Sequence, residues 1–351
     1  MDAFLLTGFR SAVGKAPRGM FRSVRPDDLG ANIVRHMVNS IPGFEQEWID
    51  DIIVGNATPE AEQGLQMGRW VAVRSLPIEV PGVTVNRYCG SGVETIAMAT
   101  AKIKAGFADV IIAGGTESMS LVPTVGFKTV PNFEVSKNTP EYMLGMGHTA
   151  EKLATVYGIT REQADEFSYQ SHQKAIKAIQ GGLFKDEIVP IEVEEIYVEN
   201  GKRKTKKYVV DTDEGPRADT SLEVLGNLRP AFSMGGIVTA GNSSQTSDGA
   251  SFVIVMSERM VKELNLEPIA RMVNCASAGV DPSIMGIGPL VSIALSQHLS
   301  QTDYRRSDAL VAAFGLDPRP RESGCYQGSR KLSKQGHPEY RRLLYLAAQG
   351  A

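Results

Sequence analysis

The pattern of apolar and polar positions divides the first third of the chain into short apolar runs and amphipathic segments. Largely apolar runs at residues 3–7, 80–85 and 108–113 predict strands, of which the latter two are expected to be buried, and residues 49–54 alternate acidic and apolar residues before they become another strand. Segments of helical periodicity lie between these runs, over residues 25–38, from 64 onward and over 93–107. This alternation predicts an α/β fold with a mostly parallel sheet and helices on both faces.

Residues 121–232 interrupt this alternation and predict an insertion. Thr160 and Gln163 form a capping box before a helix that ends near Gly181-Gly182. Residues 193–210 are strand-like and highly charged, and their basic run at 202–207 is typical of a solvated hairpin. The chain then returns through a Gly-rich segment at 235–244 to a predicted strand at 250–256.

Cys89 lies where a predicted strand meets a predicted helix. The helix N-terminus carries partial positive charge and favours a thiolate at this position. Gly90 and Gly92 leave room for a substrate beside the backbone. A buried cysteine that packs as a small apolar residue is the alternative, and the two flanking glycines favour the reactive interpretation.

The pair Gly114-Gly115 follows the apolar run at 108–113. Two interpretations are equally open at this stage. The pair forms either a tight turn beside a ligand at the carboxyl edge of the sheet or an ordinary turn at a strand end.

The composition is that of an ordinary globular protein. The 351 residues carry a net charge of −3, 42% hydrophobic residues and 22% charged residues, as in ordinary globular chains. The three cysteines, Cys89, Cys275 and Cys325, are far apart and odd in number, which argues against a disulfide framework. We recognise neither a signal peptide nor a membrane-spanning run, and we therefore expect a cytoplasmic protein without membrane contact.

The charge changes sign toward the C-terminus. Residues 303–351 hold nine lysines and arginines against five acidic residues, whereas the rest of the chain is net acidic. Such asymmetry suggests two origins within one chain, and nucleic-acid contact would involve only this basic tail.

Residues 1 to about 290 resemble the thiolase family, the 3-ketoacyl-CoA and acetyl-CoA acyltransferases. Several sequence blocks occur here in the family's order, which makes the resemblance specific. The blocks are Asn86-Arg87-Tyr88-Cys89-Gly90-Ser91-Gly92, Gly114-Gly115-Thr116-Glu117-Ser118-Met119-Ser120, Met146-Gly147-His148-Thr149-Ala150-Glu151, Arg229-Pro230-Ala231-Phe232 and Val238-Thr239-Ala240-Gly241-Asn242-Ser243-Ser244.

The resemblance implies acyl transfer between an acyl-CoA and coenzyme A through an acyl-cysteine at Cys89. It implies that Ser244 lies near the pantetheine arm and that Arg217 meets the adenine or its phosphate. His148 would neighbour the thioester, or would instead be a satisfied histidine at a helix end. Coenzyme A is then a substrate; no permanently bound cofactor and no metal are implied. A homo-oligomer formed through the N-terminal domain is also implied.

The thiolase mechanism requires further groups that stand in three later blocks of the family. The Asn-Glu-Ala-Phe block does not occur in this sequence. Gly336-His337-Pro338 and Cys325-Tyr326-Gln327-Gly328 occur in the reverse of the family order and with other neighbours, and we interpret both as coincidences. The catalytic set is therefore expected to be incomplete.

The tail instead resembles insertion-sequence transposases of the IS116/IS110/IS902 type, which are RNA-guided DNA recombinases. The resemblance rests on Gly286-Ile287-Gly288-Pro289-Leu290, on residues 309–321, on Glu322-Ser323-Gly324 and on residues 330–344. In the transposases a serine in this Arg-x-Ser-Gly context is a candidate nucleophile, which makes Ser323 the corresponding residue here. The junction is predicted near 285–290.

Together the resemblances predict a thiolase-like αβα sandwich half with a loop-domain insertion, whose second half is replaced by a mostly helical tail. The expected domains are 1–120 with 233–268, a loop domain at 121–232, a remnant at 269–290 and the tail at 291–351. Three functions stay open: an enzyme that keeps only the acylation half-reaction or none, a DNA-binding remnant, and a non-functional product of an insertion event.

Overall fold

The computed structural model describes residues 2–289 and 292, and beyond them only the backbone of four short strands. These strands pair antiparallel, β10 (Pro318–Arg319) with β13 (Lys331–Leu332) and β11 (Glu322–Ser323) with β12 (Tyr326–Gln327). The expected helical tail otherwise lies outside the described residues.

The chain forms two compact units, each described here by itself. The first, which we call the sheet unit, comprises Met1–Val130, Glu166–Leu225 and Ser243–Met272. The second unit comprises Pro131–Asp165, Gly226–Asn242 and Val273–Ala351. The domain boundaries expected from the resemblance stay a prediction. Among the described residues, no helix is long and apolar enough to cross a membrane.

A mixed sheet with the strand order β4-β3-β5-β8-β1-β9 is the centre of the sheet unit, and β2 pairs with β8. Its strands are β1 (Ala3–Arg10), β2 (Gly14–Lys15), β3 (Asp51–Gly55), β4 (Gly82–Val85), β5 (Val110–Ser118), β8 (Ser247–Ser257) and β9 (Ala270–Arg271). The pairings of β3 with β4 and β5 are parallel, as predicted.

The prediction of a mostly parallel sheet is wrong for the other half of the sheet. The returning strand β8 lies between β5 and β1 and is antiparallel to both. The reason is that the chain re-enters the sheet from the insertion at the edge where β5 ends. It then has to run back along β5.

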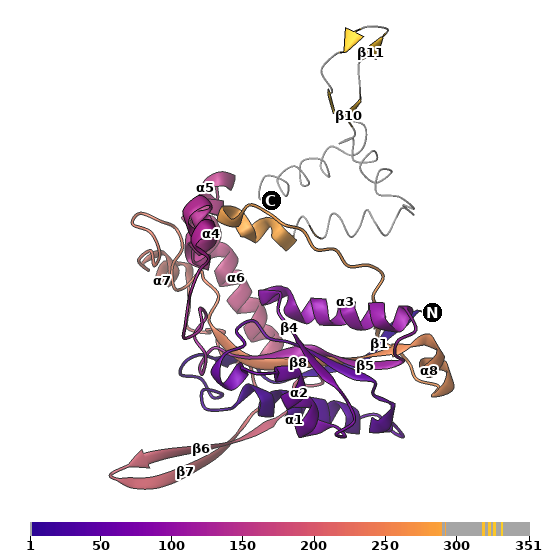
Figure 1. Ribbon diagram of the computed structural model, residues 1–351. Coiled ribbons are helices and arrows are strands. Elements are labelled where there is room, and N and C mark those ends of the chain that lie inside the picture. Colours follow the sequence, from indigo (N-terminus) through magenta and orange to yellow (C-terminus); the bar gives the residue numbers. More distant parts are fainter. Residues whose placement is uncertain are drawn as a thin grey trace. The chain divides into compact units, whose positions relative to one another are not determined.

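Helices cover both faces of this sheet (Figure 1). The helices α1 (Pro26–Asn39) and α2 (Met67–Ser75) cover one face, and α3 (Ser91–Lys104) covers the other. Alternate residues of each central strand therefore enter different cores: Ile52 packs in the cluster under α1 and α2, and Ile53 in the cluster under α3. Burial on both faces explains the uninterrupted apolar runs of these strands.

The Gly114-Gly115 pair lies inside β5, so both turn interpretations are wrong. A Cβ on Gly114 would overlap the carbonyl oxygen of Ser251 in the neighbouring strand β8. These glycines thus allow close strand approach in the sheet, and β5 continues past them to Ser118.

The charged hairpin is confirmed as β6 (Ile191–Glu199) and β7 (Lys202–Val210), and it extends away from the sheet (Figure 1). Asn200 and Gly201 connect the strands with positive φ angles of 52° and 73°, which suit a two-residue hairpin turn. Ile191, Val193 and Val210 at its base are buried in the core, whereas the acidic and basic residues of its outer part are exposed.

The remaining helices of the insertion and return are short, apart from α6 (Arg161–Gln180). The capping box before α6 is confirmed, because the Thr160 backbone N–H donates to Gln163 Oε1 and the Gln163 N–H donates to Thr160 Oγ1. The others are α4 (Phe133–Asn138), α5 (Met146–Tyr157), α7 (Leu222–Gly226) and α8 (Glu258–Glu263). In the second unit, α5 packs against the 3₁₀ helix η5 (Pro282–Ile287), which contains residues of the predicted junction.

Candidate active site

Cys89 lies in the 3₁₀ turn Tyr88–Gly90 between β4 and α3, and it is exposed. The predicted order of strand, cysteine and helix is thus confirmed. Ser91 fixes the turn through its hydroxyl group, which accepts from the Arg87 N–H at 2.9 Å and donates to the Tyr88 carbonyl at 2.6 Å. The sulfur is therefore presented beside the first turn of α3, where backbone N–H groups lack partners within the helix.

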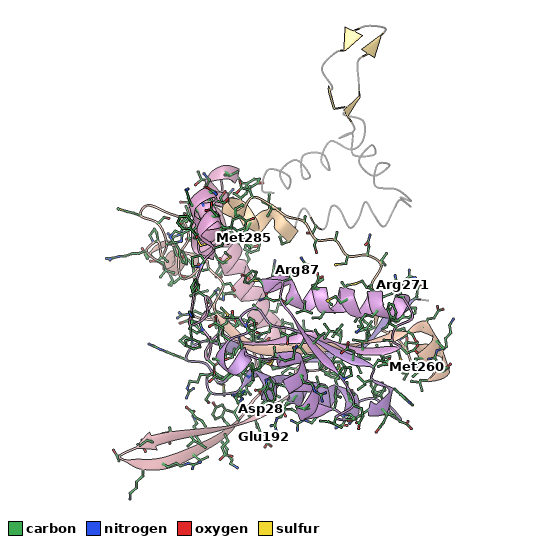
Figure 2. All side chains as sticks on the ribbon, in the orientation of Figure 1. Asp28, Arg87, Glu192, Met260, Arg271 and Met285 are labelled. Atoms are coloured by element: carbon green, nitrogen blue, oxygen red, sulfur yellow. The ribbon has the colours of Figure 1, made fainter. Side chains whose placement is uncertain are left out.

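Tyr88 adopts the left-handed backbone conformation with a φ of 45°, which is unfavourable for a residue with a bulky side chain. Asn86 Oδ1 accepts the Tyr88 N–H at 2.9 Å and so supports this conformation. Arg87, at the N-terminal end of α3 in Figure 2, forms two hydrogen bonds with Glu94, at 2.7 and 3.0 Å.

A polar network that runs from the exposed Asn86 to the buried Gln63 lies behind this turn. Asn86 Nδ2 donates to the Ala57 carbonyl at 3.0 Å, and the Ala57 N–H donates to Glu117 Oε2 at 2.7 Å. Gln63, which is fully buried, donates from Nε2 to Glu117 Oε1 at 2.8 Å and accepts the Ser118 N–H at 2.6 Å. Glu117 stands in one of the matching blocks but has no predicted role, and Gln63 carries no motif that would predict one.

The environment of Glu117 opposes its ionisation. Burial raises the pKa of the Glu117 carboxyl above its ordinary value, because the charged form is desolvated there. Hydrogen bonds from the Ala57 N–H and from Gln63 act in the opposite direction and offset only part of this effect.

Two further predicted residues, Ser244 and Arg217, lie on loops of the sheet unit that contact each other. Gln245, next to Ser244, donates from Nε2 to the Glu214 carbonyl at 3.1 Å. Ser244 is exposed, and its hydroxyl group forms only a long hydrogen bond of 3.4 Å to the Gln245 carbonyl. Arg217 is also exposed and pairs with Asp219 at 2.9 Å, which raises the pKa of Arg217.

The sheet topology places Cys89, Ser244 and the Arg217 loop along one edge. Cys89 follows the end of β4, and Ser244 precedes the start of the antiparallel strand β8 at the same edge. The Arg217 loop is fixed beside the end of β1, because the Glu214 N–H donates to the Val13 carbonyl. Neighbouring strands are about 4.8 Å apart, so β4 lies about 14 Å from β8 and about 19 Å from β1 across the sheet. The strand β8 begins four residues beyond Ser251, the residue level with the end of β4, so Ser244 lies further along the strand direction as well.

His148 belongs to the second unit, in the first turn of α5, whereas the other three predicted residues belong to the sheet unit. Its exposed ring makes an edge contact with Phe232, with 6.0 Å between ring centroids. Glu151 of the same helix accepts the Ile237 and Val238 N–H groups at 2.9 Å each, which holds the segment before Ser244.

For Ser323, the structure describes only a backbone pairing opposite Tyr326 in β11 and β12. Cys325 and the Gly336-His337-Pro338 segment lie outside the described residues. Within the described part of the chain, no three histidine, cysteine or acidic side chains gather as metal ligands would.

The sheet unit is an α/β fold that presents an exposed cysteine at a strand-to-helix turn, and comparisons with known proteins identify its family. The thiolase N-terminal domain family matches residues 3–259. The 3-ketoacyl-CoA thiolase of Bacillus subtilis (strain 168) is 50% identical over 294 residues, which cover 83% of this chain and 75% of that protein. The chain belongs to the thiolase family.

Other relatives and a second family extend this result. An acetyl-CoA acetyltransferase of Pseudomonas aeruginosa is 40% identical over 333 residues, which cover 90% of this chain and 82% of that protein. The crystal structure of the Bacillus anthracis acetyl-CoA acetyltransferase superposes with a TM-score of 0.74 at 34% identity, covering 88% of this chain and 78% of that one. Residues 282–351 match the IS116/IS110/IS902 transposase family, which confirms the second resemblance.

Proposed function

We propose that this thiolase-family chain takes an acyl group from an acyl-CoA onto Cys89 and that it completes thiolysis or condensation poorly. The observation that carries the proposal is the exposed cysteine in a fixed turn at the N-terminus of α3. The thiolate attacks the thioester carbonyl, the carbon–sulfur bond to coenzyme A breaks, and coenzyme A leaves as its thiol after protonation.

The order of groups along the sheet edge supports coenzyme A as the leaving group. A ligand with its thioester at Cys89 that lies across the strand ends would pass the start of β8, which Ser244 precedes, before it reaches the Arg217 loop beside the end of β1. An elongated arm with a phosphate-bearing end matches this order, since an arginine is a favourable phosphate partner. Arg217 would have to exchange Asp219 for that phosphate. His148 stays a proposed neighbour of the thioester, on the strength of its sequence block alone.

Impaired turnover follows from the blocks that the sequence does not contain. A histidine that activates the cysteine, a second cysteine and the oxyanion-binding groups stand in the later blocks of the family. Loss of a general base costs about 10²–10⁴-fold in rate, and loss of an oxyanion donor about 10²–10³-fold.

Mass spectrometry after incubation with acetyl-CoA tests the nucleophile. We expect a slowly formed adduct of one acetyl group, which peptide mapping assigns to Cys89 and which the substitution Cys89→Ser removes. A protein that remains unmodified, or that is acetylated elsewhere to the same extent, would refute Cys89 as the acyl acceptor.

We also propose a homo-oligomer formed through the sheet unit. The strand β4 pairs with β3 on one side and ends the sheet on its other side. Large apolar side chains around β4 and α2 are exposed, including Leu65 at 91%, Tyr88 at 75% and Ile78 at 66%. Exposed edges and apolar patches of this kind mark interaction surfaces. Sedimentation of the full chain as a monomer at micromolar concentration would contradict this proposal.

The second candidate function is binding of nucleic acid through the tail. It is favoured by the transposase-family match at 282–351 and by the nine basic residues after position 302. Binding through phosphate contacts would weaken steeply as salt concentration rises. Retention on DNA-cellulose that is independent of salt, or no retention at all, would exclude this function.

A further inference from the structure

We propose that Glu117 and Gln63 are positioning residues for Cys89, which act by fixing the Ala57 peptide group against which the cysteine turn is built. The proposal rests on Cys89 as the acyl acceptor. It assigns a role to two residues that touch neither the sulfur nor the substrate, because they lie behind the turn.

The connection consists of hydrogen bonds on the two sides of one peptide segment. The Ala57 N–H donates to Glu117, and the Ala57 carbonyl accepts from Asn86, at 2.7 and 3.0 Å. Glu117 is held in turn by Gln63, which also donates to the Thr58 carbonyl at 2.8 Å. These hydrogen bonds fix residues 56–58, which in turn support the cysteine turn through the Ala57 carbonyl.

Asn86 transmits this fixed position to Cys89. Its Oδ1 atom accepts the N–H of Tyr88, the residue directly before Cys89. Because Tyr88 has the left-handed φ of 45°, the turn needs external support to keep this conformation. A displaced Ala57 carbonyl would release Asn86, and the turn could then relax and move the sulfur away from the start of α3.

Burial fixes the part of this support around Asn56, whereas the two hydrogen bonds of Asn86 lie at the surface. Asn56, next to Ala57, is 1% exposed; its N–H donates to the Val85 carbonyl and its Nδ2 to the Thr116 carbonyl, at 3.0 and 2.9 Å. The ends of β3, β4 and β5 are therefore joined where Cys89 emerges. The Oδ1 atom of Asn56 is buried and has no hydrogen-bond partner among the described residues, but its N–H and Nδ2 groups resist a shift, since each would then lose its acceptor.

The variant Glu117→Gln tests the role, because the new amide must direct its N–H₂ group toward either the Ala57 N–H or Gln63 Nε2. One hydrogen bond is lost in each case. The double variant Gln63→Glu with Glu117→Gln restores both bonds when the new carboxyl group at position 63 is protonated, because its O–H group can then donate to the Thr58 carbonyl in place of Gln63 Nε2. Asp51→Asn is the matched control, since this buried carboxylate pairs with Lys102 at the opposite end of β3.

Two readouts on the full chain are used. The first is the iodoacetamide labelling rate of Cys89 divided by that of Cys275, and the second is hydrogen exchange of the peptide that spans residues 86–92. We expect Glu117→Gln to lower the ratio about fivefold, corresponding to one lost hydrogen bond, and to speed exchange. The exchanged pair should recover most of both effects, and Asp51→Asn should change neither.

Wild-type values of both readouts in Glu117→Gln, or an exchanged pair no better than the single variant, would overturn the positioning role. This outcome is distinct from failure of the proposed function. If wild-type protein forms no acyl adduct while Glu117→Gln still loosens residues 86–92, the acyl-transfer proposal fails and the positioning of the turn stands.

Discussion

At the scale of single residues, the desolvated carboxyl group of Glu117 makes the stability of the folded protein depend on pH. Burial raises its pKa above the ordinary value of 4.5, so the folded protein holds this proton to higher pH than the unfolded chain. Between the two pKa values the unfolded chain binds fewer protons, and the free energy of unfolding falls as pH rises. The contribution of Glu117 is fully present below pH 4.5 and is lost as pH rises through its folded-state pKa.

This fall of the free energy of unfolding with rising pH leads to a prediction for the variant Glu117→Gln, whose amide side chain does not titrate. The melting temperature of wild type minus that of the variant should decrease from about pH 4.5 to about pH 7, because only wild type has to ionise a buried carboxyl. Differential scanning calorimetry at several pH values measures the difference. An increase over this range would show that the hydrogen bonds to Glu117 outweigh its desolvation.

The ion pair between Arg217 and Asp219 permits a second prediction at this scale. If Arg217 meets a phosphate of coenzyme A, Arg217→Ala should weaken coenzyme A binding, whereas Asp219→Asn should leave it equal or stronger. The pair is exposed and screened by solvent, so its loss should change coenzyme A binding only modestly. Calorimetric titration with coenzyme A measures both variants, and equal weakening by the two would argue against a phosphate contact.

At the scale of elements, two glycines of the sheet unit differ in the space around them, Gly114 in the strand β5 and Gly92 in the helix α3. Gly114 lies where β5 and β8 leave no room for a Cβ, whereas Gly92 in α3 has open space around it. An added methyl group would therefore overlap the neighbouring strand at Gly114, whereas it would meet no other atom of the described residues at Gly92.

We predict that Gly114→Ala destabilises the protein by about 2–3 kcal/mol, because the methyl group forces the strands apart. Gly92→Ala should be neutral or stabilising by up to about 1 kcal/mol, since alanine favours a helix. Chemical denaturation of the two variants gives both values. A Gly114→Ala protein as stable as wild type would mean that the strands are less closely paired than described.

The sequence predicts those elements whose pattern is local. The buried strands β3 and β5, the capping box at Thr160 and the position of Cys89 before α3 follow from periodicity and end signals. The prediction that the run at 80–85 is buried is wrong, because β4 is a half-buried strand at the edge of the sheet. The antiparallel direction of β8 depends on where a long insertion returns, and the close approach at Gly114 depends on a strand 137 positions later, at Ser251. Gln63 carries no recognisable motif, because its role arises only from a distant carboxylate.

At the scale of the whole molecule, the chain joins two family matches, to the thiolase N-terminal domain at 3–259 and to a transposase at 282–351. Apolar positions of the transposase-like tail belong to a different fold from that of the thiolase portion. They are therefore not expected to match surfaces that the thiolase portion exposes, such as the apolar residues beside β4.

We accordingly predict that removal of residues 291–351 changes the melting temperature little, by less than about 2 °C, because half a kilocalorie per mole or less would be lost. Thermal melts of the full chain and of residues 1–290 under identical conditions make the comparison. A loss of several degrees on truncation would show that the tail covers and stabilises the thiolase portion.

The central proposal is that Cys89 accepts an acyl group and that turnover is poor, because we do not recognise the later catalytic blocks of the family in this sequence. The most direct measurement follows the release of free coenzyme A from acetyl-CoA over time at known protein concentration. The account predicts a slow release of at most one equivalent per chain, absent in Cys89→Ser, and acetoacetyl-CoA thiolysis slower than that of an ordinary enzyme by at least about 10²-fold. Sustained turnover of acetoacetyl-CoA at an ordinary enzymatic rate would contradict it.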